Sequence, residues 1–449
     1  MRLPALLALL VVLAGCSVGY SPEHAQRTPT PETDVPPPAA SSTPTATATP
    51  DGTPTATATP AGPVTPTPTP TATATPTPTP SAPGRIEVVG GSLPVNATLV
   101  YERTAGLLGT DVEGPERVSL LEVPTGTSDP PEFYRAFGLT RTGGNATVAA
   151  FVSEPSTVYV NRALANDSVF VEHVLAHEYV HVVQFRTGVV DTLGLVFGGG
   201  IDASAANRAV VEGSATYVQE RYWREYQNEG ESPIADVRAD HRNATGLARY
   251  SFAPYRFGYD YVNASVESPA RLRGVYRDIP ATTEAILHPG RGDSLVPLSV
   301  RIEDGPGRWN TTVAPPPTRV GELFLRSALA TELDEDRAAR AADGCGNDTR
   351  RSFAAPDGER GYVWTIRWDA AGEATEFADA FREWADARAE RVGTDRWAGE
   401  WGYALDRPAP RVTAIRVGPT SFLDASAVTP ADGSDGTDTR NATVTVRVD

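Results

Sequence analysis

The residues most able to do chemistry lie in one short motif, His177-Glu178-Tyr179-Val180-His181, which has the pattern H-E-x-x-H. Side chains four residues apart share one face of a helix, so the two imidazoles can bind one metal ion. Glu178 lies beside them and is placed to accept a proton from a water molecule held there. The motif therefore predicts a zinc site on a helix, with the chemistry of metal-assisted hydrolysis.

A zinc ion that does chemistry takes three protein ligands, so a third residue must be found. His173 continues the i, i+4 row, but it lies about 12 Å from residue 181 along a helix axis, too far for three imidazoles to reach one ion. We therefore expect His173 to support the site or to pack beside it. Glu212, in a second helix, is the better third ligand, and the small Ala215 lets the two helices approach. A solvated helix carboxylate is the alternative interpretation of Glu212.

Together these motifs resemble the gluzincin metallopeptidases, in which an H-E-x-x-H helix is followed by a glutamate helix, here Glu212-Gly213-x-Ala215. The resemblance implies that His177, His181 and Glu212 bind Zn²⁺ and that Glu178 is the general base. It implies an α+β fold with a small β-sheet, an active-site helix, a glutamate helix and a C-terminal α/β extension. The residues around the motifs are similar to haloarchaeal surface proteins with a peptidase-MA-like domain.

The sequence departs from thermolysin-type enzymes at two places. Thr216 stands where those enzymes carry an aspartate that orients a histidine ligand, so other groups must do this here. No downstream histidine motif of the thermolysin type is recognisable, so the donor to the tetrahedral oxyanion has to be sought elsewhere. The candidates are Tyr259 and His288, with Tyr255 and Tyr261 as alternatives. A core tyrosine, or a histidine that ends a helix, is the plainer interpretation of each.

A mixed order of helices and strands is expected around these motifs. Strands are predicted over 147–152 and 157–161, and Val158–Asn161 is a candidate edge strand for an extended peptide. Helices are predicted over Ser168–Thr187, Asn207–Gln227, Pro254–Ser265, Glu322–Glu332 and Glu373–Ala389. A further strand is predicted over Tyr362–Trp368, and Arg411–Val417 and Ala442–Val448 are expected to pair with each other.

The first 84 residues do not have the composition of a globular domain. Residues 1–16 are expected to be a lipoprotein signal peptide, because an apolar stretch ends in Leu13-Ala14-Gly15-Cys16, which resembles the lipobox of prokaryotic lipoproteins. Cys16 is then the lipidated residue, and plain secretory cleavage is the alternative. Residues 17–84 are rich in Thr and Pro and predict a disordered stalk. We expect a metallopeptidase-like domain over 85–315 and a C-terminal α/β subdomain over 316–449.

Asn-x-Ser/Thr sequons in an exported chain are candidate glycosylation sites. They lie at Asn96, Asn145, Asn166, Asn243, Asn263, Asn310, Asn347 and Asn441.

The negative net charge of the chain limits which molecules it can bind. The net charge is −17, and all 39 basic residues are arginine. Such a surface repels nucleic acid, which is therefore excluded as a partner. Acidity together with the lack of lysine favours a protein kept soluble in strong salt, with an ordinary acidic secreted protein as the alternative. Cys345 matches no motif and is expected to be an unpaired structural thiol.

Three functions fit these observations. The first is a zinc metallopeptidase that is lipid-anchored at the extracellular face of the cell membrane and hydrolyses extracellular proteins or peptides. The second is a non-catalytic surface protein that keeps a zinc ion for binding or structure. The third is a surface module in which H-E-x-x-H is accidental. The intact Glu178 favours the first, because a structural zinc site does not need that carboxylate.

Overall fold

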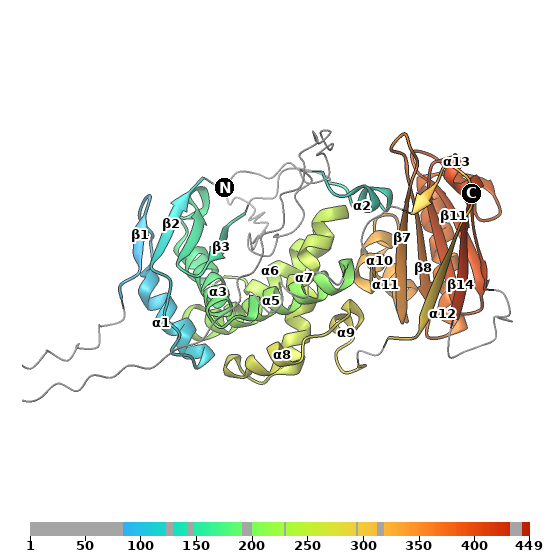
Figure 1. The fold of residues 1–449 in the computed structure, drawn as a ribbon. Coiled ribbons are helices and arrows are strands. Elements are labelled where there is room, and N and C mark those ends of the chain that lie inside the picture. The colour runs from blue at the N-terminus through green and yellow to red at the C-terminus, as the bar shows by residue number, and fades with distance from the viewer. Residues whose placement is uncertain are drawn as a thin grey trace, which may run out of the picture. The chain divides into compact units, whose positions relative to one another are not determined.

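The computed structural model describes residues 84–122, 129–141, 148–190, 200–228, 230–292, 295–311, 318–431 and 442–449 (Figure 1). The predicted signal peptide with Cys16, the predicted stalk, and the sequons at Asn145 and Asn441 lie outside these residues. Within them, helices and strands alternate in a mixed α+β structure, as the sequence predicts. No helix of the described part is long and apolar enough to cross a bilayer.

The first element of the fold is a small sheet with the strand order β1-β2-β4-β3. Its strands are β1 (Glu87–Val89), β2 (Arg117–Leu121), β3 (Ala150–Glu154) and β4 (Thr157–Asn161). The β1-β2 and β2-β4 pairs are parallel, and β3 runs antiparallel to β4. Helix α1 (Ala97–Leu108) connects β1 to β2 and is capped by Asn96, whose Oδ1 accepts the backbone N–H groups of Thr98 and Leu99.

The expectation that Val158–Asn161 forms an edge strand is wrong. This segment lies in β4, which is bonded to β2 on one side and to β3 on the other, so no free backbone is left to pair with a peptide. The edges of this sheet are β1 and β3. Alternating apolar residues predict a strand, but both an edge and an interior strand can carry that pattern.

Long helices follow the sheet and form most of the first half of the fold (Figure 1). They are α3 (Ser168–Arg186), α5 (Ile201–Tyr222), α6 (Pro233–Asn243) and α7 (Gly246–Ser265), with the 3₁₀ turn η2 (Arg162–Leu164) before α3 and the π-helix η4 (Trp223–Gln227) after α5. Asp167 caps α3 by accepting the N–H of Phe170, which confirms the predicted start of that helix.

Helix α7 begins eight residues before the expected Pro254, which lies inside the helix. A proline at a first turn is favourable, but sequence alone does not exclude an interior one.

Helices α5 and α7 cross in backbone contact at Gly213 and Gly258. A Cβ atom on Gly213 would lie 2.6 Å from the Cα of Gly258, and one on Gly258 would lie 2.8 Å from the carbonyl carbon of Ala209. The close approach therefore depends on these two glycines, one of which lies directly beside Glu212. Ala215, which was expected to let the H-E-x-x-H helix and the glutamate helix approach, is fully buried on α5.

The second half of the fold is built on a seven-stranded sheet with the order β6-β7-β8-β12-β11-β10-β9. Its strands are β6 (Asn310–Thr311), β7 (Asn347–Ala354), β8 (Arg360–Arg367), β9 (Glu390–Gly393), β10 (Arg396–Ala398), β11 (Gly402–Ala409) and β12 (Val412–Gly418). A three-stranded sheet has the order β13-β14-β5, with β5 (Leu298–Asp304), β13 (Ser426–Pro430) and β14 (Ala442–Val448). The helices of this half are α10 (Glu322–Leu329), α11 (Glu335–Ala342), α12 (Ala371–Arg388) and α13 (Thr420–Ala425).

Side chains of β8 alternate between two hydrophobic cores, which places a layer on each face of the large sheet. Trp364 and Ile366 pack in one core with Phe324 of α10 and Phe381 of α12. Val363 packs in the other with residues of β13 and β14. The alternation follows from the two-residue period of a strand and produces three layers: helices, the large sheet and the small sheet.

The expected pairing of the two C-terminal strands is wrong. Strand β12 pairs with β8 and β11, whereas β14 pairs with β13 and, in parallel, with β5. The register places Val446 of β14 opposite Ile302 of β5. A strand pattern predicts that a segment is a strand, but it does not predict which distant strand it pairs with. That choice depends on how the whole chain packs.

Segments from before residue 315 also belong to the C-terminal cores. Helix α2 (Glu132–Ala136) packs Phe133 against Phe324 and Trp364, with ring centroids 5.3 and 5.9 Å apart, and β5 belongs to the small sheet. Residues 84–449 accordingly form one unit. Cys345 is buried and forms no disulfide within the described residues.

The α5-α7 crossing yields a prediction about stability. We expect Gly258→Ala to destabilise the fold by about 3 kcal/mol, because the added methyl group meets the α5 backbone, which cannot rotate away. Thermal and denaturant unfolding measure this loss. The matched control is Gly372→Ala on α12, where an added Cβ has no neighbour within 4 Å. Equal stability of the two variants would contradict the packing described here.

Candidate metal centre

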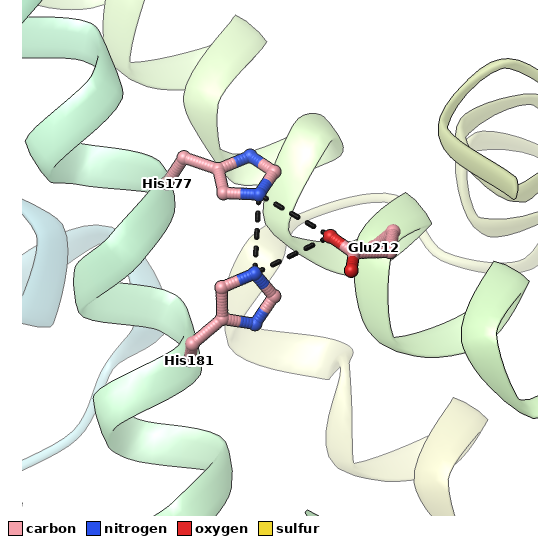
Figure 2. A group of neighbouring side chains, drawn as sticks. All are labelled: His177, His181 and Glu212. Carbon is pink, nitrogen blue, oxygen red and sulfur yellow. Dashed lines mark hydrogen bonds and ion pairs between the residues drawn. The ribbon is translucent and has the colours of Figure 1, made fainter. Parts of the chain in front are cut away.

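The two histidines of the H-E-x-x-H motif lie one turn apart on α3 and face Glu212 on α5 (Figure 2). Their Nε2 atoms are 3.1 Å apart, and Oε2 of Glu212 is 3.5 Å from Nε2 of His177 and 3.4 Å from Nε2 of His181. Zinc bonds of about 2.0 to 2.2 Å place the ligands of a tetrahedron about 3.3 to 3.6 Å apart. The two distances to Glu212 fall in this range and the distance between the imidazoles is slightly shorter, so the triangle of ligand atoms is close to the size of a tetrahedral zinc site.

Two glutamine side chains orient the histidines. Oε1 of Gln219 is 3.1 Å from Nδ1 of His177, and Oε1 of Gln184 is 2.7 Å from Nδ1 of His181. An amide oxygen can only accept, so each Nδ1 donates its proton and each Nε2 keeps a free lone pair. Gln184 is itself held in place, because its Nε2 donates to the carbonyl of Val211 at 3.1 Å. In zinc proteins a carboxylate commonly accepts the proton of a ligand histidine, and here two glutamine oxygens accept it.

The carboxylates of the site have no other partners. Both oxygens of Glu178 and both oxygens of Glu212 are buried and make no hydrogen bond within the described residues. Burial raises the pKa of Glu178 to about 8. Burial also raises the pKa of Glu212, but the adjacent His177 and His181 side chains and the charge of Arg208 outweigh this effect and bring it down to about 2. Two imidazole lone pairs and an ionised carboxylate directed at one point repel one another unless a cation lies between them, so the residues fit a divalent metal ion.

The site lies below the protein surface. His177, His181 and Glu178 have no exposed surface, and Glu212 is 1% exposed. Tyr255 of α7 stacks on the His177 ring, with centroids 6.1 Å apart and planes at 25°. Helix α7 therefore contributes an aromatic wall to the site, and the α5-α7 crossing beside Glu212 holds that wall in place.

Tyr259 and His288, which the sequence suggests as catalytic residues, are not beside the ligand triad. Tyr259 packs against Tyr217 at 6.1 Å between ring centroids and lies under the guanidinium of Arg238. His288 ends α9 (Thr283–Leu287) and lies 2.8 Å from Glu322. The alternative Tyr261 is half-buried on α7. Among the four candidates, Tyr255 is the one whose ring is shown to stack on a histidine of the triad.

His173 has the supporting role expected of it. Nε2 of Gln219 donates to Nδ1 of His173 at 2.8 Å, so His173 helps to hold the glutamine that orients His177. Burial lowers the pKa of His173 to about 4, and the ring is therefore neutral.

Sequence reasoning missed three residues of this site. Gln184 follows His181 by three residues and Gln219 follows Glu212 by seven, both on the ligand-bearing faces of their helices. Arg208 precedes Glu212 by four residues, and its guanidinium lies 5.9 Å from the Tyr255 ring. Helical spacing from the ligands could have indicated all three.

The predicted glycosylation sites differ in exposure. Asn96, Asn166, Asn243, Asn263 and Asn310 are exposed. Asn347 is half-buried in β7, where its Nδ2 donates to the carbonyl of Val296 at 2.8 Å.

Comparison with known proteins reaches only the second half of the fold. Residues 311–428 match the model of a domain family of unknown function, DUF8575. These residues run from the end of β6 to β13 and include α10, α11 and α12. Neither the curated proteins nor the solved structures contain a match to this chain.

The orienting glutamines yield a prediction about metal affinity. We expect Gln219→Leu to weaken zinc binding about 10- to 100-fold, because His177 loses the group that fixes its tautomer and ring orientation. Competition with a chromophoric chelator measures the affinity. Gln227→Leu is the control, since Gln227 donates to the carbonyl of Val169 and touches no ligand. Equal affinities would show that Gln219 does not orient His177.

Proposed function

We propose that this protein is a zinc-dependent metallopeptidase of gluzincin type that hydrolyses extracellular proteins or peptides. The observation that carries the proposal is Glu178: a fully buried carboxylate with no hydrogen-bond partner in the described residues, directly beside the ligand triad. Burying an unpartnered carboxylate is costly, and a zinc ion held only for structure gains nothing from it. A general base for water is the role that accounts for it.

Zinc bound by His177, His181 and Glu212 would supply positive charge that polarises a carbonyl group and lowers the pKa of water to about 7. Glu178 accepts the proton of the attacking water and returns it to the leaving amine. Its raised pKa, about 8 from burial, suits both steps near neutral pH. Gln184 and Gln219 keep the imidazoles in the required tautomer.

Tyr255 takes the place proposed for Tyr259 as the donor to the developing oxyanion. It is the candidate that stacks on a ligand histidine, and Arg208 lies over its ring. A phenol held beside a cation donates a strong hydrogen bond to a negatively charged oxygen.

A non-catalytic zinc protein is the second candidate, and one specific observation favours it. The ligands are at most 1% exposed, whereas a catalytic site needs a path for substrate. The peptidase proposal therefore requires the wall formed by α7 to open for substrate, and the non-catalytic proposal requires it to stay closed.

The predicted location completes the proposal. Lipidation at Cys16 and the stalk over 17–84 would hold the folded part at the extracellular face of the membrane. The charge of −17 fits that location better than contact with nucleic acid.

Metal content gives the first test. We expect the purified chain, loaded with zinc and dialysed in strong salt, to retain one tightly held zinc ion. An ion bound by three converging side chains dissociates slowly. His177→Ala should lose it, while His241→Ala, which alters a histidine hydrogen-bonded to Arg256, should keep it. Elemental analysis measures both. Equal zinc in the parent and in His177→Ala would end the metal-site proposal.

Glu178 gives the second test. We expect Glu178→Gln to keep its zinc but to lose peptidase activity by about 10²- to 10⁴-fold, since the amide cannot accept the proton. Cleavage of casein and of a mixed peptide library is followed by mass spectrometry in strong salt. Glu225→Gln, an exposed position after α5, is the control.

If Glu178→Gln cleaves as fast as the parent, Glu178 is not the base. If the zinc-loaded parent cleaves nothing and zinc removal only lowers its melting temperature, the non-catalytic protein is the correct function.

A further inference from the structure

A second cluster of metal-ligating side chains lies away from the H-E-x-x-H centre. His288, Glu322 and Asp343 each present one ligand atom, and these atoms all lie within 4.8 Å of one another. Nε2 of His288 is 2.8 Å from Oε1 of Glu322 and 3.5 Å from Oδ1 of Asp343. We propose that these three residues form a second divalent-cation site, distinct from the zinc centre and independent of the proposed peptidase activity.

The buried carboxylate of Glu322 is the observation that separates this cluster from an ordinary surface ion pair. Glu322 is 2% exposed, and its Oε2 is buried without a hydrogen-bond partner in the described residues. A proton on His288 satisfies Oε1 alone, and Asp343 is too distant from that ring for a hydrogen bond. A cation that binds the carboxylate would satisfy the oxygen that the imidazole cannot reach.

Further carboxylates lie around the cluster. Glu284 lies one turn before His288, and burial together with the charges of Glu322 and Asp369 raises its pKa to about 7. Gly344 and Gly346 have no Cβ, which lets the carboxylates of Glu373 and Asp369 reach the chain directly after Asp343.

Four arginines lie among these carboxylates. Arg291 donates to Asp343 through its Nη1 and Nη2 atoms, from a half-exposed position. Arg326 acts on Glu322 from α10, and Arg367 and Arg411 act on Asp369. None of these arginines hydrogen-bonds Oε2 of Glu322, so that buried oxygen stays available to a cation.

The ligand chemistry indicates the class of ion. One imidazole nitrogen with two or more carboxylate oxygens suits Mn²⁺ or Zn²⁺ better than Ca²⁺ or Mg²⁺, which prefer oxygen alone. His288 is 19% exposed and Asp343 is 40% exposed, so exchange with solvent is faster here than at the buried zinc centre. We assign the second site to a more weakly held ion, for which Mn²⁺ is the probe.

The position of the site gives it a structural role. His288 ends α9, whereas Glu322 begins α10 and Asp343 follows α11, both in the part that matches the DUF8575 family. The other end of α9 is already tied to the glutamate helix: Asp202 of α5 accepts the backbone N–H of Thr283 at 2.8 Å. An ion at the second site would therefore fasten α9 between the helix that carries Glu212 and the C-terminal helices.

Manganese binding to the zinc-loaded chain tests this proposal. With the zinc centre filled and weakly held zinc removed by dialysis, we expect one Mn²⁺ per chain by electron paramagnetic resonance titration and a rise in melting temperature when it binds. Glu322→Gln should weaken Mn²⁺ binding at least tenfold, and Asp343→Asn, at a partly exposed position that tolerates change, should do the same if Glu322→Gln does not fold. Asp357→Asn is the control, because this exposed carboxylate pairs with Arg308 elsewhere on the fold.

The outcomes separate the two sites. His177→Ala should keep its Mn²⁺ site although it loses tightly held zinc, so failure of the peptidase proposal leaves this one standing. No Mn²⁺ binding to the zinc-loaded parent, or equal binding by the parent, Glu322→Gln and Asp343→Asn, would overturn the second site.

Discussion

The convergence of three unprotonated ligand atoms inside a dry helix interface is the constraint on which the first half of the fold depends. Two imidazole nitrogens and a carboxylate oxygen lie 3.1 to 3.5 Å apart with almost no exposure to solvent. Without a cation, this arrangement costs both desolvation and repulsion between lone pairs. With one, the same atoms bind α3 to α5 more firmly than apolar contacts alone could. In the proposed function, metal binding and helix packing are therefore one event.

Helix α5 contacts the C-terminal half of the fold, the two histidines and helix α7 through different parts of its length. Asp202 in the first turn accepts hydrogen bonds from Thr283 and Arg319, at the start of α9 and before α10. Glu212 in the middle faces the histidines, and Gly213 beside it admits the backbone of α7. Gln219 near the end orients His177. A shift of this helix along its axis would disturb the ligand triad, the aromatic wall and the contact with the C-terminal half together.

The two histidines are oriented by glutamines and not by carboxylates, which keeps further negative charge away from the ligand triad. Amide oxygens accept the Nδ1 protons without adding negative charge. Glu212 and Glu178 are then the acidic groups closest to the proposed ion, and a divalent cation would balance both in their ionised forms. This explains how Thr216 can stand where thermolysin-type enzymes carry an aspartate: its hydroxyl bonds the carbonyl of Glu212 within the helix, and orientation comes from Gln184 and Gln219.

Local sequence determined the elements that carry chemistry. The i, i+4 spacing of His177 and His181, the Asp167 cap of α3 and the helical context of Glu212 depend on neighbours within a few turns, so α3 and the ligand triad were predicted from the sequence alone. The starts of α5 and α7 were predicted several residues too late. Only tertiary structure decided which strands are partners, that β4 is an interior strand, and that β14 pairs with β5 across more than 130 intervening residues. It also moved His288 from the expected active site to a cluster with Glu322 and Asp343, and it placed Tyr255 on His177 where Tyr259 was favoured. The physical reason is the range of the interactions: caps and helical faces are set within a few residues, whereas pairing and side-chain convergence depend on the free energy of packing the whole chain.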